Sequence, residues 1–303
     1  MQALTALRDL HISHMAVSPD SRAALAQLPN LEGVHVKASG SHMKWVAEPG
    51  AALKDKVTGI TTHPGTLSFV RHLQPSQLRV LDLGTDYCGV EDCRIIERFT
   101  ALEVLRLDHC RVPDWLQNMR QLRSLTLQTT DSAHLERSLK PLTKLTALHH
   151  YHKLHYRPDT VTDLSGLTTL RELGLRLFRV LPTLPGSVTN LFVRAQPRAY
   201  GDDSGTARLF PELLAVTGLR RLTYATCAHD GYSPADIKGL TALTALTELA
   251  VHKGDDFHGG TLGELRDAVD DDGFIMRAGF NAANAAFLAP ARTDPYVCGS
   301  YIF

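Results

Sequence analysis

The histidines of this chain are the groups whose type and spacing first suggest chemistry. The stretch LHHYHKLHY, residues 148–156, places four histidines and two tyrosines within nine residues. Imidazole groups ligate metals, transfer protons and change charge near pH ~6.5. A metal site, a pH-responsive surface and a purely structural role are therefore the three interpretations of this stretch.

Other motifs with reactive residues are few. The sequence contains no nucleophile elbow, phosphate-binding glycine loop, paired zinc cysteines or H-E-x-x-H. Cys88 and Cys93 lie five residues apart in YCGVEDC, and we interpret them as packed or solvent-edge thiols rather than a catalytic pair. We predict a protein that is not an enzyme and has no cofactor.

Composition excludes several classes of partner. Lys plus Arg and Asp plus Glu both number 32, so the formal net charge is zero and attracts neither nucleic acid nor an anionic membrane. No apolar run approaches the ~20 residues of a membrane span, and no signal peptide is evident. The five cysteines form no paired spacing, which favours a reducing compartment. We expect a cytoplasmic protein.

Eleven copies of the apolar pattern L-x-x-L-x-L run through the chain, from LTALRDLHI at its start to LTALTELAV near residue 251. Of the 33 apolar slots, 31 hold Leu, Ile, Val or Tyr, and the exceptions are Thr62 and His150. The second apolar position, spaced by 18 to 31 residues, falls at Leu10, Val34, Ile60, Leu81, Leu105, Leu125, Leu148, Leu173, Leu191, Leu222 and Leu249.

This pattern resembles the leucine-rich repeat family over residues 4–254. The resemblance implies an α/β fold, a curved solenoid with a parallel sheet on its concave face and short helices or loops on its convex face. The segments DSRAALAQL, CRIIERF and LFPELLAV between the repeats read as helices. We divide the chain into a solenoid of about eleven repeats, residues 1–254, and a C-terminal cap helix with a partly disordered non-repeat tail, residues 255–303.

Two features depart from the family. Met1 lies inside the first repeat, which leaves no room for an N-terminal cap and makes a fragment one interpretation of the chain. The Asn or Cys that the family prefers after each strand occurs here only as Cys110 and Cys227. Because that side chain satisfies backbone groups at the turn, we expect irregular curvature and modest stability.

The repeat frame separates the clustered histidines. Side chains alternate along a strand, so Leu148 and His150 point into the core while His149 and Tyr151 face the concave side. Adjacent residues on opposite faces cannot ligate one ion, and neighbouring carboxylates or thiols are missing. We therefore predict no metal site.

The concave face is nevertheless rich in histidine. Eight of the fifteen histidines fall on its positions, where random placement would put about two. We hypothesise that partner binding is sensitive to pH through this face, with His11, His35, His109 and His152 as candidates. The alternative is that histidine merely suits a polar strand surface. The eight are His11, His14, His35, His63, His109, His149, His152 and His252.

The centre of the chain carries the predicted contact patch, because tyrosine and arginine are the types enriched in binding hot spots. Its members are His149, Tyr151, Glu172, Arg176, Phe192, Arg194 and Arg221. We predict a monomeric protein–protein interaction scaffold that binds a protein partner on its concave face and binds neither nucleic acid nor membrane. Arginines that are simply solvated are the alternative.

Two further functions follow from resemblance. One is the substrate-recognition arm of a ubiquitin-ligase adaptor. The other is a structural protein of the cytoskeleton or axoneme, since the Ala/Thr-rich LTALTALTEL resembles repeats of algal and protist proteins. Repeat folds host unrelated partners, so the sequence does not identify the partner.

Overall fold

The computed structural model of the chain describes residues 4–13, 17–37, 42, 44–48, 52–62, 66–83, 88–107, 113–129, 135–152, 163–178, 181–195, 211–226 and 243–253. Only the backbone is described at residues 128–129, 151–152, 176–178, 194–195, 211–212, 225–226 and 250–253. The predicted cap helix and tail, residues 255–303, lie outside these ranges, as do Cys110 and Cys227.

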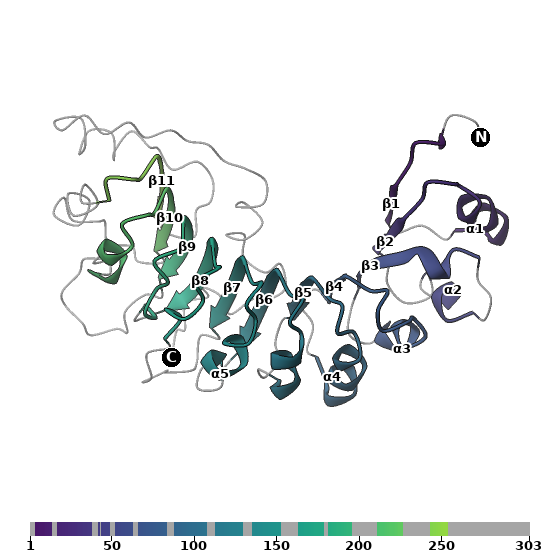
Figure 1. Cartoon of the computed structure of the whole chain (residues 1–303), viewed down its shortest axis with the longest axis horizontal. Helices are drawn as coiled ribbons and strands as arrows, with labels where there is room; N and C mark the ends of the chain where they lie inside the picture. Colours follow the sequence, from purple (N-terminus) through teal and green to yellow (C-terminus); the bar gives the residue numbers. More distant parts are fainter. Residues whose placement is uncertain are drawn as a thin grey trace, which may run out of the picture. The chain divides into compact units, whose positions relative to one another are not determined.

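Each of the eleven sequence repeats forms one strand. The strands are parallel, and their order in the sheet is their order in the chain (Figure 1). This is the arrangement that the repeat pattern predicts. The strands are β1 (Asp9–Ser13), β2 (Gly33–Lys37), β3 (Val57–Thr61), β4 (Val80–Asp82), β5 (Val104–Leu107), β6 (Ser124–Thr129), β7 (Ala147–His152), β8 (Glu172–Phe178), β9 (Asn190–Ala195), β10 (Arg221–Thr226) and β11 (Glu248–Lys253).

The chain forms two compact units, residues 1–145 and residues 146–303. In the first unit the second apolar residues of β4, β5 and β6 pair in register, as Leu81, Leu105 and Leu125. All three are 0% exposed. Because burying a leucine side chain contributes about 1.5–3 kcal/mol, such rows are a main source of the fold's stability.

One register in this unit departs from the repeat frame. The frame places Val34 opposite Ile60, whereas the structure pairs Val34 with Val57 and Val36 with Ile60, with a shift between Val34 and His35. A bulge lets three residues of β3 oppose two of β2. Val57 and Ile60 are nevertheless both 0% exposed, as Leu78 and Leu81 are in the next repeat.

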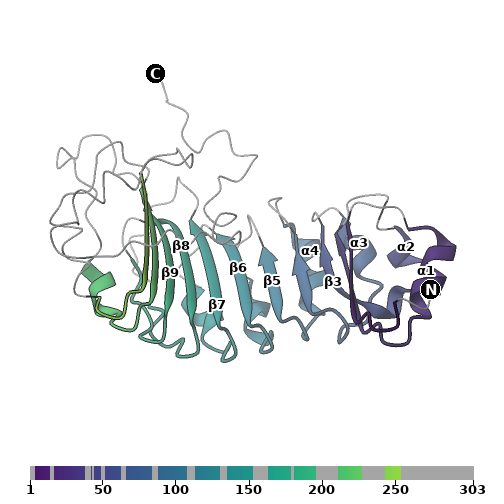
Figure 2. The ribbon, with the colours of Figure 1, turned by 90° about the horizontal axis from the view of Figure 1, so that it is seen from above.

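The second unit keeps the predicted register along its leucine row, and the pairing of β8 and β9 shifts only beyond it, between Arg176 and Phe178. Leu148, Leu173, Leu191, Leu222 and Leu249 form one row across β7 to β11, and each is at most 4% exposed. β7, β8 and β9 run side by side in Figure 2.

The two polar residues in apolar slots also point inward, as predicted for His150. Thr62 is 4% exposed, and its hydroxyl is hydrogen-bonded to that of Thr66. His150 is 1% exposed and lies in β7 beside the buried Leu148. The alternation of side chains along a strand accounts for both positions, since these slots face the core whatever residue occupies them.

Short helices return the chain between strands. Those of the first unit are α1 (Pro19–Ala26), α2 (Lys44–Ala47), η3 (Lys54–Lys56), α3 (Leu67–Val70), α4 (Val90–Glu97), η5 (Asp114–Asn118) and α5 (Leu135–Leu139), and the second unit has η6 (Pro211–Ala215). The helices predicted in DSRAALAQL and CRIIERF are confirmed as α1 and α4. In the described part of LFPELLAV, residues 211–216, the structure has the short 3-10 helix η6.

Local sequence sets where these helices begin and what they bury. Ser18 caps α1 by accepting a hydrogen bond from the Ser21 N–H at 3.2 Å, and Pro19 occupies the first turn, where its missing N–H is tolerated. Trp45 of α2 and Ile96 of α4 are at most 5% exposed. The returns therefore cover the leucine side of the sheet and leave its other face to the polar strand positions.

Candidate binding surface on the sheet

The candidate site is the sheet face opposite the leucine rows, which we call the polar face. It carries the residue that follows each second apolar position. In the described strands these residues are His11, His35, Thr61, Asp82, Arg106 and Thr126 in the first unit and His149, Gly174, Phe192, Thr223 and Ala250 in the second.

A pair of stacked histidines begins the polar face of the first unit. His11 of β1 and His35 of β2 pair in register, with ring centroids 5.1 Å apart and planes 5° from parallel. His35 Nε2 also lies 2.9 Å from the Thr61 hydroxyl of β3. The imidazole of His35 is thus held on both sides, which fixes its orientation.

Gly59 makes this arrangement fit. It pairs with His35 across β2 and β3, and a Cβ at Gly59 would lie 2.5 Å from His35 Nδ1. Real Cβ atoms do not approach other atoms so closely, so any side chain there would displace the ring. The absent side chain lets His35 lie across β3 and reach Thr61.

The His35 imidazole is less basic than an ordinary histidine. Burial is the largest cause that lowers its pKa, and the neighbouring His11 lowers it further, against an opposing effect of Asp82. A second positive charge beside His11 is unfavourable in a half-buried site. His35 is therefore held in its neutral form to lower pH than a solvated imidazole.

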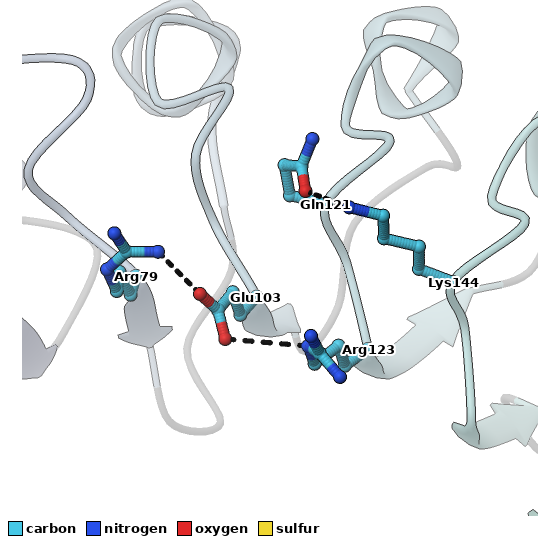
Figure 3. Close-up of polar contacts among 5 residues, drawn as sticks. All are labelled: Arg79, Glu103, Gln121, Arg123 and Lys144. Carbon is cyan, nitrogen blue, oxygen red and sulfur yellow. Dashed lines mark hydrogen bonds and ion pairs between the residues drawn. The ribbon is translucent and has the colours of Figure 1, made fainter.

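A charged row lies where the chain enters the strands of the first unit. Glu103 places one carboxylate oxygen 2.5 Å from Arg79 Nη1 and the other 3.6 Å from Arg123 Nε (Figure 3). Gln121 and Lys144 make a further contact of 2.6 Å beside it. Exposed ion pairs contribute about 0–1 kcal/mol, so this row shapes the surface charge more than it stabilises the fold.

The backbone holds this strand-entry row in place. The Arg79 carbonyl accepts the N–H groups of Glu103 and Val104 at 2.7 and 3.0 Å, and the Glu103 carbonyl accepts those of Arg123 and Ser124 at 2.8 and 3.0 Å. Each residue is thereby fixed to its neighbour, and its side chain starts from an ordered position.

Sequence reasoning missed this row because its residues come before the strand positions that were expected to face the concave side. Every member lies two residues before the buried second apolar position. Down that column the first unit reads Arg8, Glu32, Thr58, Arg79, Glu103 and Arg123, and the second reads Thr146, Arg171, Thr189, Arg220 and Thr247. The sequence therefore contains a signal of this row. In the first unit the column holds charges of opposite sign, and in the second unit Thr and Arg strictly alternate.

In the second unit the structure brings three of the predicted contact residues together. His149 Nε2 lies 3.1 Å from a Glu172 carboxylate oxygen, and the His149 ring centroid lies 6.4 Å from that of Phe192. His149 and Phe192 stand two strands apart, on either side of Gly174. Backbones at that separation are ~9.6 Å apart, so the rings approach because Gly174 has no side chain between them.

Charge and burial distinguish these three residues. The hydrogen bond from His149 is the largest cause that lowers the pKa of the Glu172 carboxyl, and burial opposes it. The Glu172 side chain is 38% exposed and that of His149 is 16% exposed, whereas Phe192 is only 4% exposed. Phe192 is thus a buried side chain beside the imidazole, and Glu172 presents a charge to solvent.

Arg221 extends the exposed charge along the first strand positions. Its Nε lies 3.0 Å from a Glu248 carboxylate oxygen of β11, and its side chain is 49% exposed. Glu172, Asn190, Arg221 and Glu248 occupy one register row across β8 to β11. The neutral Asn190 separates Glu172 from Arg221 in this row, and the arginine, although paired with Glu248, remains half exposed.

The remaining predicted contact residues are placed by their backbone alone. Tyr151, Arg176 and Arg194 share one register row across β7, β8 and β9, as the repeat frame predicts. His152 ends β7, and its side chain, like those three, is not described. His109, together with His14 and His63, lies outside the described residues.

No three His, Cys, Asp or Glu side chains among the described residues could hold a metal ion together. No helix in the described part of the chain is both long and apolar enough to cross a membrane.

Comparisons with known proteins return structural likeness alone. No family model matches the chain, and no curated protein matches its sequence. An internalin from Listeria monocytogenes is similar in structure, with 16% identity, 82% of this chain and 75% of that chain covered, and a TM-score of 0.47. A leucine-rich repeat protein from Leptospira interrogans has 12% identity, coverage of 89% and 97%, and a TM-score of 0.37. By its parallel strands in chain order and its rows of buried leucines, this chain has the α/β leucine-rich repeat fold.

Proposed function

We propose that this protein is a non-enzymatic scaffold that recognises a protein partner through the polar face of its sheet, the face that the repeat pattern predicts to be concave. The observation that carries the proposal is the ordered charge of that face in the second unit. Glu172 and Arg221 are held by His149 and Glu248 at 3.1 and 3.0 Å, yet remain 38% and 49% exposed.

Order before binding is the physical advantage of such a surface. Immobilising a flexible side chain at an interface costs about 0.5–1.5 kcal/mol, and a side chain already held by its neighbour loses less. Backbone hydrogen bonds between successive strands supply the rest of the order. We propose that Tyr151, Arg176 and Arg194 extend the contact surface. They form the register row two residues further along the strands than the row of His149, Gly174 and Phe192.

The burial of Phe192 decides which substitutions can test this surface. Phe192 is 4% exposed, so truncating it to alanine would remove buried packing worth about 3–5 kcal/mol, and a loss of binding could then come from unfolding. The face variant is therefore Arg176→Ala, Arg194→Ala, Arg221→Ala. The matched control is Arg94→Ala, Arg120→Ala, Arg137→Ala, which removes the same charge from exposed positions on the returns.

The experiment is affinity capture from native lysate with the wild-type chain, the face variant and the control, compared by mass spectrometry. We expect a protein bound by the wild type and the control to be lost from the face variant, because only that variant changes the proposed surface. Equal capture by all three, or equal loss from both variants, would contradict binding through the polar face. Circular dichroism verifies that each variant is folded.

A further inference from the structure

Two cysteine thiols meet at the beginning of α4. Gly89 is the N-cap of this helix, so Cys88 immediately precedes the cap and Cys93 is the fourth helical residue. Side chains at these two positions pack against each other in the hydrophobic staple, which fixes how the chain enters a helix. Here the two Sγ atoms lie 3.9 Å apart.

The backbone around the cap keeps the thiols adjacent. The Cys93 N–H donates to the Gly89 carbonyl at 3.1 Å, and the Gly89 N–H donates to the Asp92 carboxylate at 2.9 Å. Both contacts tie the cap to the first helical turn. Cys88 and Cys93 therefore start from positions that hold their side chains together without a covalent bond.

The two thiols differ in access and in acidity. Cys88 is 4% exposed, whereas Cys93 is half-buried and reaches solvent. The hydrogen bond from the Cys88 thiol is the largest cause that lowers the pKa of Cys93, against burial and the charge of Asp92. Because the thiolate is the reactive form, Cys93 is suited to react first and Cys88 to resolve.

We propose that Cys88 and Cys93 form a redox-responsive dithiol that closes reversibly to a disulfide within one chain, with a hydroperoxide as the oxidant. The Cys93 thiolate attacks a peroxide oxygen, so an S–O bond forms and the O–O bond breaks. The departing oxygen takes a proton and leaves as water or an alcohol. Cys93 is then a sulfenic acid, oxidised by two electrons.

The second step forms the bridge. The Cys88 sulfur attacks Cys93 Sγ, so the S–S bond forms and the S–O bond breaks, and the proton of the Cys88 thiol leaves with the hydroxyl as water. Closing the pair from 3.9 Å to the ~2.05 Å of a disulfide requires the sulfurs to approach by about 1.9 Å. A dithiol reductant restores both thiols by thiol–disulfide exchange and is itself oxidised to a disulfide.

The test uses the full chain with Cys110, Cys227 and Cys298 replaced by serine, so that only this pair can react. The protein is treated with hydrogen peroxide, quenched, alkylated and digested for mass spectrometry. We expect a linked Cys88–Cys93 peptide in the monomeric protein, with free thiols falling from two to none, and recovery of both with dithiothreitol. Thiols that both stay free, or links only between chains, would overturn the proposal.

Two variants separate the roles. In Cys88→Ala the reaction should stop at a Cys93 sulfenic acid that dimedone traps, and iodoacetamide should alkylate Cys93 several-fold more slowly at neutral pH, because the Cys88 hydrogen bond is gone. In Cys93→Ser the buried Cys88 should be oxidised at least about tenfold more slowly than Cys93. Equal rates for the two lone thiols would refute the assignment, whether or not the disulfide forms.

Discussion

The neutral His35 makes the stability of the fold depend on pH. Its pKa in the folded chain lies below the ordinary value of 6.5, chiefly through burial. As pH falls through that value, the unfolded chain therefore binds the proton before the folded chain does, and stability is lost until the folded pKa is passed. We expect urea denaturation to give a lower free energy of unfolding at about pH 5.5 than at about pH 7.5.

The variant His35→Gln removes the titrating group and should flatten this difference. Glu172 does not interfere, because its pKa is lowered from 4.5 and its contribution is lost only at lower pH. A wild-type chain and a His35→Gln chain with the same slope would show that other groups carry the pH dependence. Binding of a partner at the polar face should follow the same titration only if the partner touches His35.

Gly59 is the second residue on which this site depends. In Gly59→Ala the new Cβ would meet the His35 ring at 2.5 Å, so the ring must leave its hydrogen bond with Thr61. We expect a loss of about 1–3 kcal/mol of unfolding free energy, the usual effect of overpacking, measured by urea denaturation. The pH dependence should diminish in the same variant, because the ring moves to solvent.

Gly166→Ala is the matched control for that substitution. A Cβ at Gly166 would meet nothing within 4 Å, so the fold should be unchanged or slightly stabilised by the stiffer unfolded chain. Equal destabilisation by both substitutions would mean that the loss comes from backbone conformation and not from the His35 contact.

At the scale of elements, the apolar period predicted the strands but not every register. Each second apolar residue lies in a strand, and even Thr62 and His150 point inward, because alternation fixes the face of a side chain. The bulge between β2 and β3 left no such trace, since the same sequence fits either pairing. The structure shows it in the backbone pairing, where Val34 lies opposite Val57 and Val36 opposite Ile60.

For the candidate site, the sequence predicted which residues share a register row but not which of them are buried. The register row of His149, Gly174 and Phe192 follows from the leucine frame alone. That Phe192 is buried does not, because burial depends on what covers a strand and not on its own period. The role of Gly59 was also missed, since a glycine within a strand gives no sign that the imidazole of a neighbouring strand lies over it.

At the scale of the whole molecule, a chain whose strands pair in sequence order makes its strand contacts between neighbouring repeats. Stability in such proteins is close to a sum of repeat terms and nearest-neighbour interfaces. Leu105 of β5 and Leu191 of β9 are both 0% exposed and occupy equivalent slots in the two compact units. They therefore make a matched pair for asking how far a local loss spreads.

We expect Leu105→Ala and Leu191→Ala each to remove about 2–5 kcal/mol from the repeats they join. Hydrogen exchange read by mass spectrometry should show the largest loss of protection in β4 to β6 for Leu105→Ala and in β8 to β10 for Leu191→Ala. Each variant thus serves as the control for the other. If either substitution lowered protection equally in all eleven strands, the sheet would unfold as one cooperative block, and the nearest-neighbour account of this chain would be wrong.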